Sequence, residues 1–165
     1  LHPERTLDIR TDTRIELGGT SLSICEVPGH TPGSVVVLDE RSNRLFTGDA
    51  IGSGYGVWMQ TPTAVPLETY YESLVHLLKW LVDRGGRMSF HGGHRYQMFQ
   101  STHVPSFNPP SLGLLCDLID LVDQIIHGKI VGRISNVDNI MELEPILYAA
   151  YGRAEIQYKA SNIRI

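Results

Sequence analysis

Three short segments of the sequence each place a potential metal ligand among small residues. The segments are residues 28–33 (PGHTPG), 47–50 (TGDA) and 92–94 (GGH). They contribute His30, Asp49 and His94, and two imidazoles with one carboxylate suit Zn²⁺, with Fe or Mn as alternatives. A carboxylate can also bridge two cations about 3.5–4 Å apart, which is the arrangement of a two-metal hydrolase. The pattern therefore predicts a metal site that activates water.

Each of these residues also has an ordinary structural interpretation. His30 lies in a Pro/Gly loop, where a histidine is commonly a solvated surface residue. Asp49 follows a glycine and is suited to closing a turn. His94 fits an exposed position equally well. The metal site is favoured only when the three segments are considered together.

The elements that must position these residues are strands followed by interleaved helices. Gly18-Gly19 lies between two alternating runs and predicts a tight hairpin of residues 14–17 and 20–27. Further strands are expected at residues 34–38, 44–47, 87–90, 154–158 and 163–165. Helices are expected at residues 67–84 and 111–127, the second with Leu114, Leu118, Leu121 and Ile125 buried on one face. This order favours an α/β layered domain.

Composition limits the function classes. The chain has 165 residues, 42% of them apolar and 19% charged, which predicts one globular domain spanning residues 1–165. Its net charge of −4 argues against nucleic acid as a partner, and it lacks the run of about 20 apolar residues that crosses a membrane. Cys25 and Cys116 are expected to be buried, reduced thiols, and a cytoplasmic location is expected.

The motifs GHTPGSVVV, LFTGDA and GGH, with the hairpin before them, resemble the C-terminal half of the metallo-β-lactamase fold superfamily. The glyoxalase II (hydroxyacylglutathione hydrolase)-like branch is the most similar. The resemblance implies a four-layer αββα sandwich, of which this chain supplies about one αβ half. It implies that His30 completes the ligands of a first metal, that Asp49 bridges both metals as the catalytic carboxylate, and that His94 binds the second. Zn²⁺ and a small-molecule ester or thioester substrate are the implied cofactor and substrate.

One departure from the family pattern shapes the remaining expectations. The HxHxDH signature, which supplies four further ligands, is absent from the sequence. The chain begins at Leu1 without an initiator methionine, and we expect a C-terminal portion of a longer metallohydrolase that is inactive alone. A homodimer, or pairing with a missing N-terminal half, is expected to cover the sheet face left bare.

The segment after Asp49 is expected to carry substrate specificity. Tyr55, Trp58 and Met59 lie in a glycine-hinged loop and are pocket candidates, as is Tyr96 near His94. An equal alternative is that Trp58 and Met59 fill the core. A non-catalytic, ligand-binding or regulatory module of the same fold is the competing function. A flavodiiron-type oxygen reductase ranks last, since no flavin module is evident.

Overall fold

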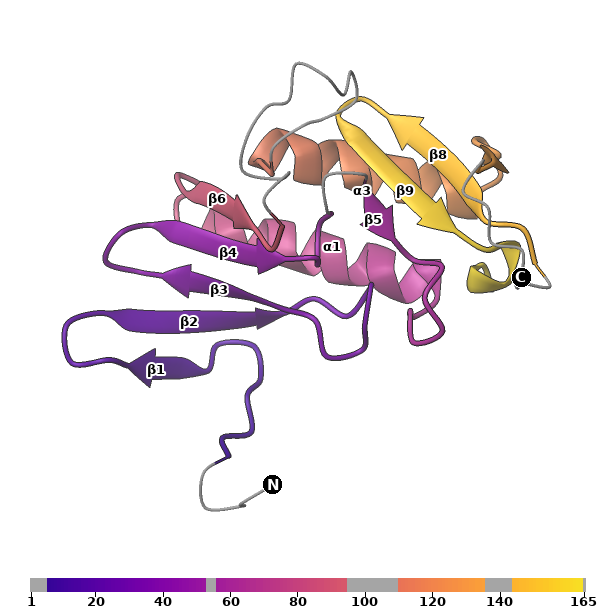
Figure 1. The fold of residues 1–165 in the computed structure, drawn as a ribbon. Coiled ribbons are helices and arrows are strands. Elements are labelled where there is room, and N and C mark those ends of the chain that lie inside the picture. The colour runs from indigo at the N-terminus through magenta and orange to yellow at the C-terminus, as the bar shows by residue number, and fades with distance from the viewer. Residues whose placement is uncertain (1–5, 53–55, 95–109, 136–143, 165) are drawn as a thin grey trace.

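The computed structural model describes residues 6–52, 56–94, 110–135 and 144–164. These residues form two β-sheets and two α-helices, so the fold is mixed α/β as predicted (Figure 1). The first sheet has the spatial order β1-β2-β3-β4-β6 and the second has the order β5-β9-β8-β7. The strands of the first sheet are β1 (Arg14–Glu16), β2 (Ser21–Glu26), β3 (Val35–Asp39), β4 (Arg44–Gly48) and β6 (Ser89–Gly92). Those of the second are β5 (Val57–Trp58), β7 (Arg133–Ile134), β8 (Leu147–Tyr151) and β9 (Ala154–Tyr158).

The strand directions in the first sheet bring the C-terminal ends of three strands to the same edge. Strands β1 to β4 pair antiparallel with their neighbours, whereas β4 and β6 are parallel. It follows that β2, β4 and β6 all run the same way. Their C-terminal ends meet at one edge of the sheet, which we call the carboxyl edge.

The two helices lie behind the sheets and pack against each other (Figure 1). Helix α1 (Leu67–Asp83) lies behind the first sheet, and α3 (Leu112–Ile126) contacts β8 and β9 of the second. The predicted stripe of α3 is confirmed: Leu114, Leu118, Leu121 and Ile125 are buried. Ser111 caps this helix, its Oγ accepting a hydrogen bond from the Leu114 amide at 3.1 Å.

Burial alternates along the central strands, as a sheet covered on one face requires. Val36, Leu38 and Leu45 point toward the helices and are buried in the core. On the opposite, outer face Phe46 is 44% exposed, and its ring stacks on His91 with the centroids 5.4 Å apart. The outer face of the first sheet therefore carries a large apolar side chain that is only partly covered.

Three features of the fold differ from the sequence-based expectations. No strand forms at residues 163–164, because the chain turns through a 3-10 helix (Ala160–Asn162) after β9. Strands β5, β7 and β8 were not expected. Cys25 is buried as predicted, but the prediction for Cys116 is wrong, since it lies off the apolar stripe of α3 and is exposed.

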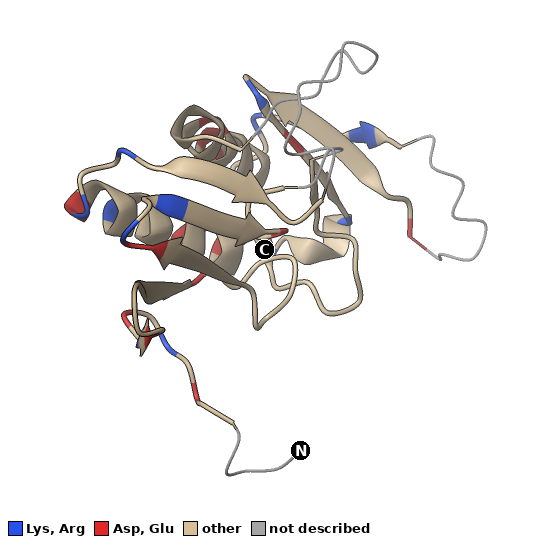
Figure 2. Ribbon diagram, turned by 60° about the vertical axis from the view of Figure 1, so that its left-hand side comes forward, with Lys and Arg blue, Asp and Glu red and all other residues tan. Residues whose placement is uncertain are grey.

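Two further features concern the distribution of charged residues and the length of the helices. Acidic and basic residues are dispersed over the described ribbon and do not gather into a basic face in the view of Figure 2. Neither helix in the described ranges is long and apolar enough to cross a bilayer.

Candidate metal centre

The carboxyl edge brings the three predicted ligands to the same side of the first sheet. His30 lies in the loop that follows β2, Asp49 follows β4 directly, and His94 lies just beyond β6. Side chains in loops at strand ends are free of the hydrogen-bond pattern of the sheet, while the sheet holds the ends of those loops in place. The sequence therefore supplies three candidate ligands, two imidazoles and one carboxylate, after three strands that run in the same direction.

Asp49 and His94 are in direct contact. His94 Nε2 lies 3.1 Å from Asp49 Oδ1 and 3.2 Å from Oδ2. Oδ1 is nevertheless buried and lacks a well-directed hydrogen bond within the described residues. A buried carboxylate oxygen with incomplete hydrogen bonding is the donor that a cation would satisfy.

Gly93 makes this contact possible. Its amide donates to the Gly48 carbonyl at 3.1 Å, which joins the ends of β4 and β6. A Cβ at Gly93 would lie 3.1 Å from Gly48 Cα and 3.5 Å from Asp49 Oδ1. The small residue lets the His94 segment come close to the Asp49 turn.

A hydrogen bond to the backbone orients His30. Its Nδ1 lies 2.6 Å from the carbonyl oxygen of Trp58, so Nδ1 carries the hydrogen and donates it. The Thr61 hydroxyl donates to the His30 carbonyl at 3.1 Å and holds the loop. This leaves Nε2 of His30 as the nitrogen available to a metal, the arrangement typical of metal-binding histidines.

One buried tyrosine of α1 connects the two loops that carry His30 and Asp49. The Tyr70 ring packs against Gly29, the residue before His30. Its hydroxyl donates to the Ala50 carbonyl, the residue after Asp49, at 2.7 Å. Burial raises the pKa of Tyr70, so the hydroxyl remains a donor. Nothing in the sequence pattern indicates this connection.

The described residues do not assemble a complete metal site. Within them no three His, Cys, Asp or Glu side chains come close enough together to hold one ion. Asp49 and His94 form a pair, and His30 stands apart from it on the same edge. The residue types fit a metal, and this part of the chain supplies too few ligands in one place for tight binding.

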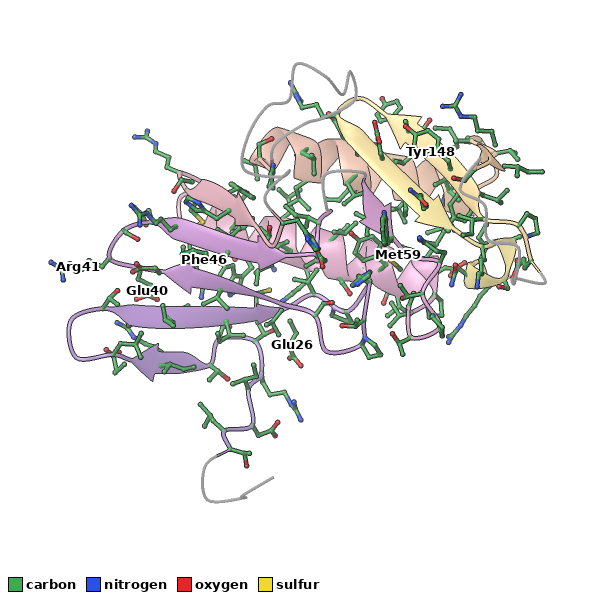
Figure 3. The ribbon with its side chains drawn as sticks, viewed as in Figure 1. Glu26, Glu40, Arg41, Phe46, Met59 and Tyr148 are labelled. Carbon is green, nitrogen blue, oxygen red and sulfur yellow. The ribbon has the colours of Figure 1, made fainter. Side chains whose placement is uncertain are left out.

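The four pocket candidates have different outcomes. Trp58 is 43% exposed, next to His30. Met59, which is labelled in Figure 3, is fully buried in the core, as the alternative interpretation of this residue expected, because the alternation of β5 continues one residue past the strand. Tyr55 and Tyr96 lie outside the described residues.

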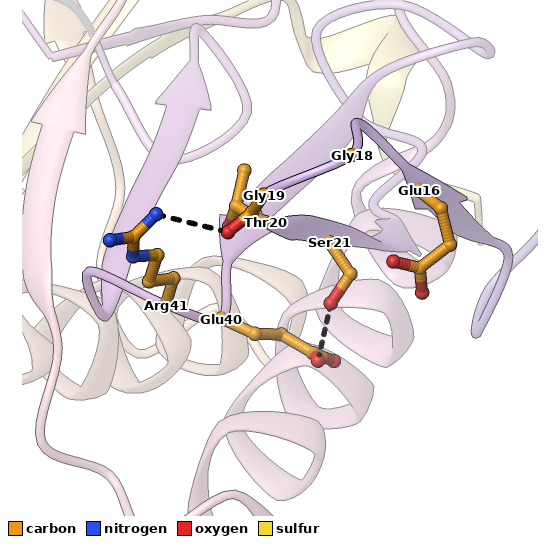
Figure 4. Close-up of a pocket in the computed structure, with 7 residues that line it drawn as sticks. All are labelled: Glu16, Gly18, Gly19, Thr20, Ser21, Glu40 and Arg41. Carbon is orange, nitrogen blue, oxygen red and sulfur yellow. Dashed lines mark hydrogen bonds between the residues drawn. The ribbon is translucent and has the colours of Figure 1, made fainter.

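A hollow of about 550 Å³ lies at the other end of the first sheet (Figure 4). The residues lining it include Glu16, Ser21, Glu40 and Arg41. Hydrogen bonds from Ser23 and Ser21 lower the pKa of Glu40, and Arg41 donates to the Gly19 carbonyl. The polar groups around the hollow are therefore hydrogen-bonded to one another and connect two turns. This end of the sheet lies opposite the carboxyl edge.

Comparison with known proteins places this geometry in a family. The family model described as the metallo-beta-lactamase superfamily matches residues 2–95, more than half of the chain. The chain belongs to the metallo-beta-lactamase superfamily. The match includes His30, Asp49 and His94. No curated protein matches the chain significantly.

Several solved structures are similar to this chain over part of their length. ETHE1 from Myxococcus xanthus is 21% identical with a TM-score of 0.46, covering 69% of this chain and 51% of its own. An archaeal superfamily protein from Sulfolobus tokodaii is 19% identical with a TM-score of 0.45, covering 83% and 46%. TTHA1623, solved in a di-iron-bound form, is 26% identical with a TM-score of 0.41, covering 62% and 42%. The chain thus spans about half the length of these relatives.

Proposed function

We propose that this chain forms part of a metal-dependent hydrolase that cleaves an ester, thioester or related bond, as in the glyoxalase II-like branch. The observation that carries the proposal is the carboxyl edge. There, His30, Asp49 and His94 follow the C-terminal ends of β2, β4 and β6, and Asp49 contacts His94 at 3.1 Å. Membership of the metallo-beta-lactamase superfamily supports it.

The three residues have distinct roles in the proposed site. Asp49 would serve as the bridging carboxylate, and its Oδ1, which lacks a directed hydrogen bond in the described part of the chain, would be available to a metal. His94 binds beside it, and His30 binds through Nε2 because Nδ1 donates to the Trp58 carbonyl. When bound, a pair of Zn²⁺, Fe or Mn ions supplies a water of lowered pKa as the nucleophile. Tyr70 holds the His30 and Asp49 loops at a fixed separation.

The remaining ligands come, in this proposal, from an HxHxDH-type segment, which the chain's own sequence lacks. The outer face of the first sheet, where Phe46 is 44% exposed, is the surface on which such a segment packs. A homodimer that covers the same face is the competing arrangement. Analytical ultracentrifugation distinguishes them, since only the homodimer forms from this chain alone.

A second function is favoured by one specific observation. Because the described residues hold no group of three metal ligands, the chain also fits a non-catalytic module that binds a small ligand or regulates a partner. In that case Asp49 and His94 form an ordinary polar contact. The two functions differ in whether metal binding depends on Asp49.

Calorimetric titration with Zn²⁺ tests the proposal. We expect weak binding that Asp49→Ala and His94→Ala each reduce at least about tenfold, the scale of losing one ligand from a site. Asp123 and His127 provide a matched control, because they are also a carboxylate and an imidazole in contact, at 3.2 Å, on α3 and the residue after it. Asp123→Ala and His127→Ala should leave the affinity unchanged. Zn²⁺ binding that is absent, or equally reduced by both pairs, would favour the non-catalytic module.

A further inference from the structure

The outer face of the second sheet carries a row of large side chains that the hydrolase site does not use. Trp58 pairs with Gln157, Gln157 pairs with Tyr148, and Tyr148 pairs with Arg133. Paired residues point to the same side of a sheet, so these four form one row across β5, β9, β8 and β7. The alternate positions, including Ile156 and Ala149, are buried on the side of α3.

Two aromatic rings lie in this row with one strand between them. Trp58 is 43% exposed, and Tyr148 is partly buried (Figure 3). Two strand spacings separate them, roughly 10 Å. An exposed tryptophan and a tyrosine at this separation present flat apolar surfaces to an elongated ligand.

One amide side chain, that of Gln157, lies between the two aromatic residues in the row, and that of Gln60 contacts it. Gln60 Nε2 donates to Gln157 Oε1 at 3.5 Å, and Gln157 is only 7% exposed. Gln60 Oε1 is buried and has no hydrogen-bond partner in the described parts of the chain. A buried acceptor without a partner is costly, so this pair of amides is a polar feature of the face that the packing of the described residues does not explain.

The far end of the row is polar and balanced in charge. The Arg133 guanidinium lies 4.9 Å from the centre of the Tyr148 ring. Burial and the carboxylate of Glu155 raise the pKa of Tyr148, so its hydroxyl stays protonated and can donate. One cation and one anion beside the same hydroxyl favour a neutral ligand that both donates and accepts hydrogen bonds over a ligand with net charge.

We propose that the row and its neighbours Gln60 and Glu155 together bind an uncharged, elongated, polyhydroxylated molecule such as a short sugar chain. We call this set the polar strip: Trp58, Gln60, Gln157, Tyr148, Glu155 and Arg133. Pyranose rings offer C–H faces for the two aromatic rings and hydroxyls for the amides and charged groups. The Trp58 carbonyl accepts the hydrogen bond from His30. The strip thus begins at the carboxyl edge and would present an ester carried by the sugar to that edge. This last step rests on the proposed hydrolase function.

Intrinsic fluorescence provides the test, because Trp58 is exposed whereas Trp80, the other tryptophan, is 4% exposed. The probe is cellotriose, titrated with EDTA present throughout so that no metal contributes. We expect a saturable change in emission. Tyr148→Ala should weaken binding roughly five- to tenfold, the effect of losing one aromatic contact. Tyr148→Phe, which keeps the ring, should weaken it less.

Tyr151→Ala is the matched control, since Tyr151 is a 42% exposed tyrosine of the same strand that points to the other face. It should leave cellotriose binding unchanged. Absence of saturable binding, equal losses for Tyr148→Ala and Tyr151→Ala, or tighter binding of S-methylglutathione than of cellotriose would overturn the strip. None of these outcomes bears on Asp49-dependent Zn²⁺ binding, and failure of that binding would overturn the hydrolase while leaving the strip intact.

Discussion

Gly29 is expected to be the least replaceable residue of the His30 loop. A Cβ at Gly29 would lie 2.3 Å from Cδ2 and 2.5 Å from Cε2 of Tyr70, where carbon atoms normally stay about 3.5–4.0 Å apart. The ring cannot move aside freely, because Tyr70 is fully buried and its hydroxyl is bonded to the Ala50 carbonyl. We therefore expect Gly29→Ala to cost about 3 kcal/mol of unfolding free energy, the upper end for overpacking a core.

Urea denaturation followed by far-UV circular dichroism measures this cost. Gly33→Ala is the control from the same loop, since a Cβ there meets nothing within 4 Å, and its effect should be within about 0.5 kcal/mol. In a Tyr70→Ala background the methyl group at position 29 finds space, so Gly29→Ala should cost about 2 kcal/mol less than in the wild type. A Gly29→Ala variant as stable as Gly33→Ala, or strictly additive effects of the two substitutions, would refute the reasoning.

Three other predictions concern the core, the thiols and acid stability. Leu118→Ala should lower the unfolding free energy by about 2–5 kcal/mol in the same urea assay, because Leu118 is fully buried, whereas Asp120→Ala on the exposed side should change it by less than about 0.5 kcal/mol. Ellman's reagent should label Cys116 rapidly in the folded protein and Cys25 only on unfolding, since burial raises the pKa of Cys25 to about 11; two rapid thiols would contradict this. Hydrogen bonds from Ser42 and Thr20 lower the pKa of Asp39 from 3.8 to about 2, so its contribution to stability is present above about pH 4 and is lost as the pH falls to 2. Asp39→Asn should flatten acid unfolding in that window alone, and an unchanged acid profile would count against these hydrogen bonds.

The sequence predicted the first sheet and both helices because their signals are local. Gly18-Gly19 lies between two alternating runs, and the apolar stripe of α3 repeats over the whole helix. The second sheet was largely missed for the opposite reason. Strands β5 and β7 have two residues each and exist through pairing with partners distant in the chain, and β8 includes Ala149-Ala150, a weak strand signal.

The candidate site was also predicted only in part. His30, Asp49 and His94 are visible in the sequence because each lies in a motif of small residues. The contacts that position these residues are not visible there. The hydrogen bond to His30 is accepted by the backbone carbonyl of Trp58, which any residue could provide. Tyr70 connects two loops through contacts between residues distant in the sequence. Neither contact produces a recognisable sequence motif. Met59, although close in sequence to Asp49, is buried in the core, which is the alternative that the sequence left open.

The two ends of the first sheet carry different features. The candidate ligands follow β2, β4 and β6 at the carboxyl edge, whereas the Gly18-Gly19 turn and the Glu40–Arg41 turn meet at the other end around the hollow of Figure 4. The sheet between them is rigid, and the opposite turns share no side chain with the ligand loops. Sequence changes, insertions or engineered tags at those turns can therefore accumulate without altering the loops that hold the candidate ligands. The surface at one end of the sheet can vary while the candidate site at the other end is kept.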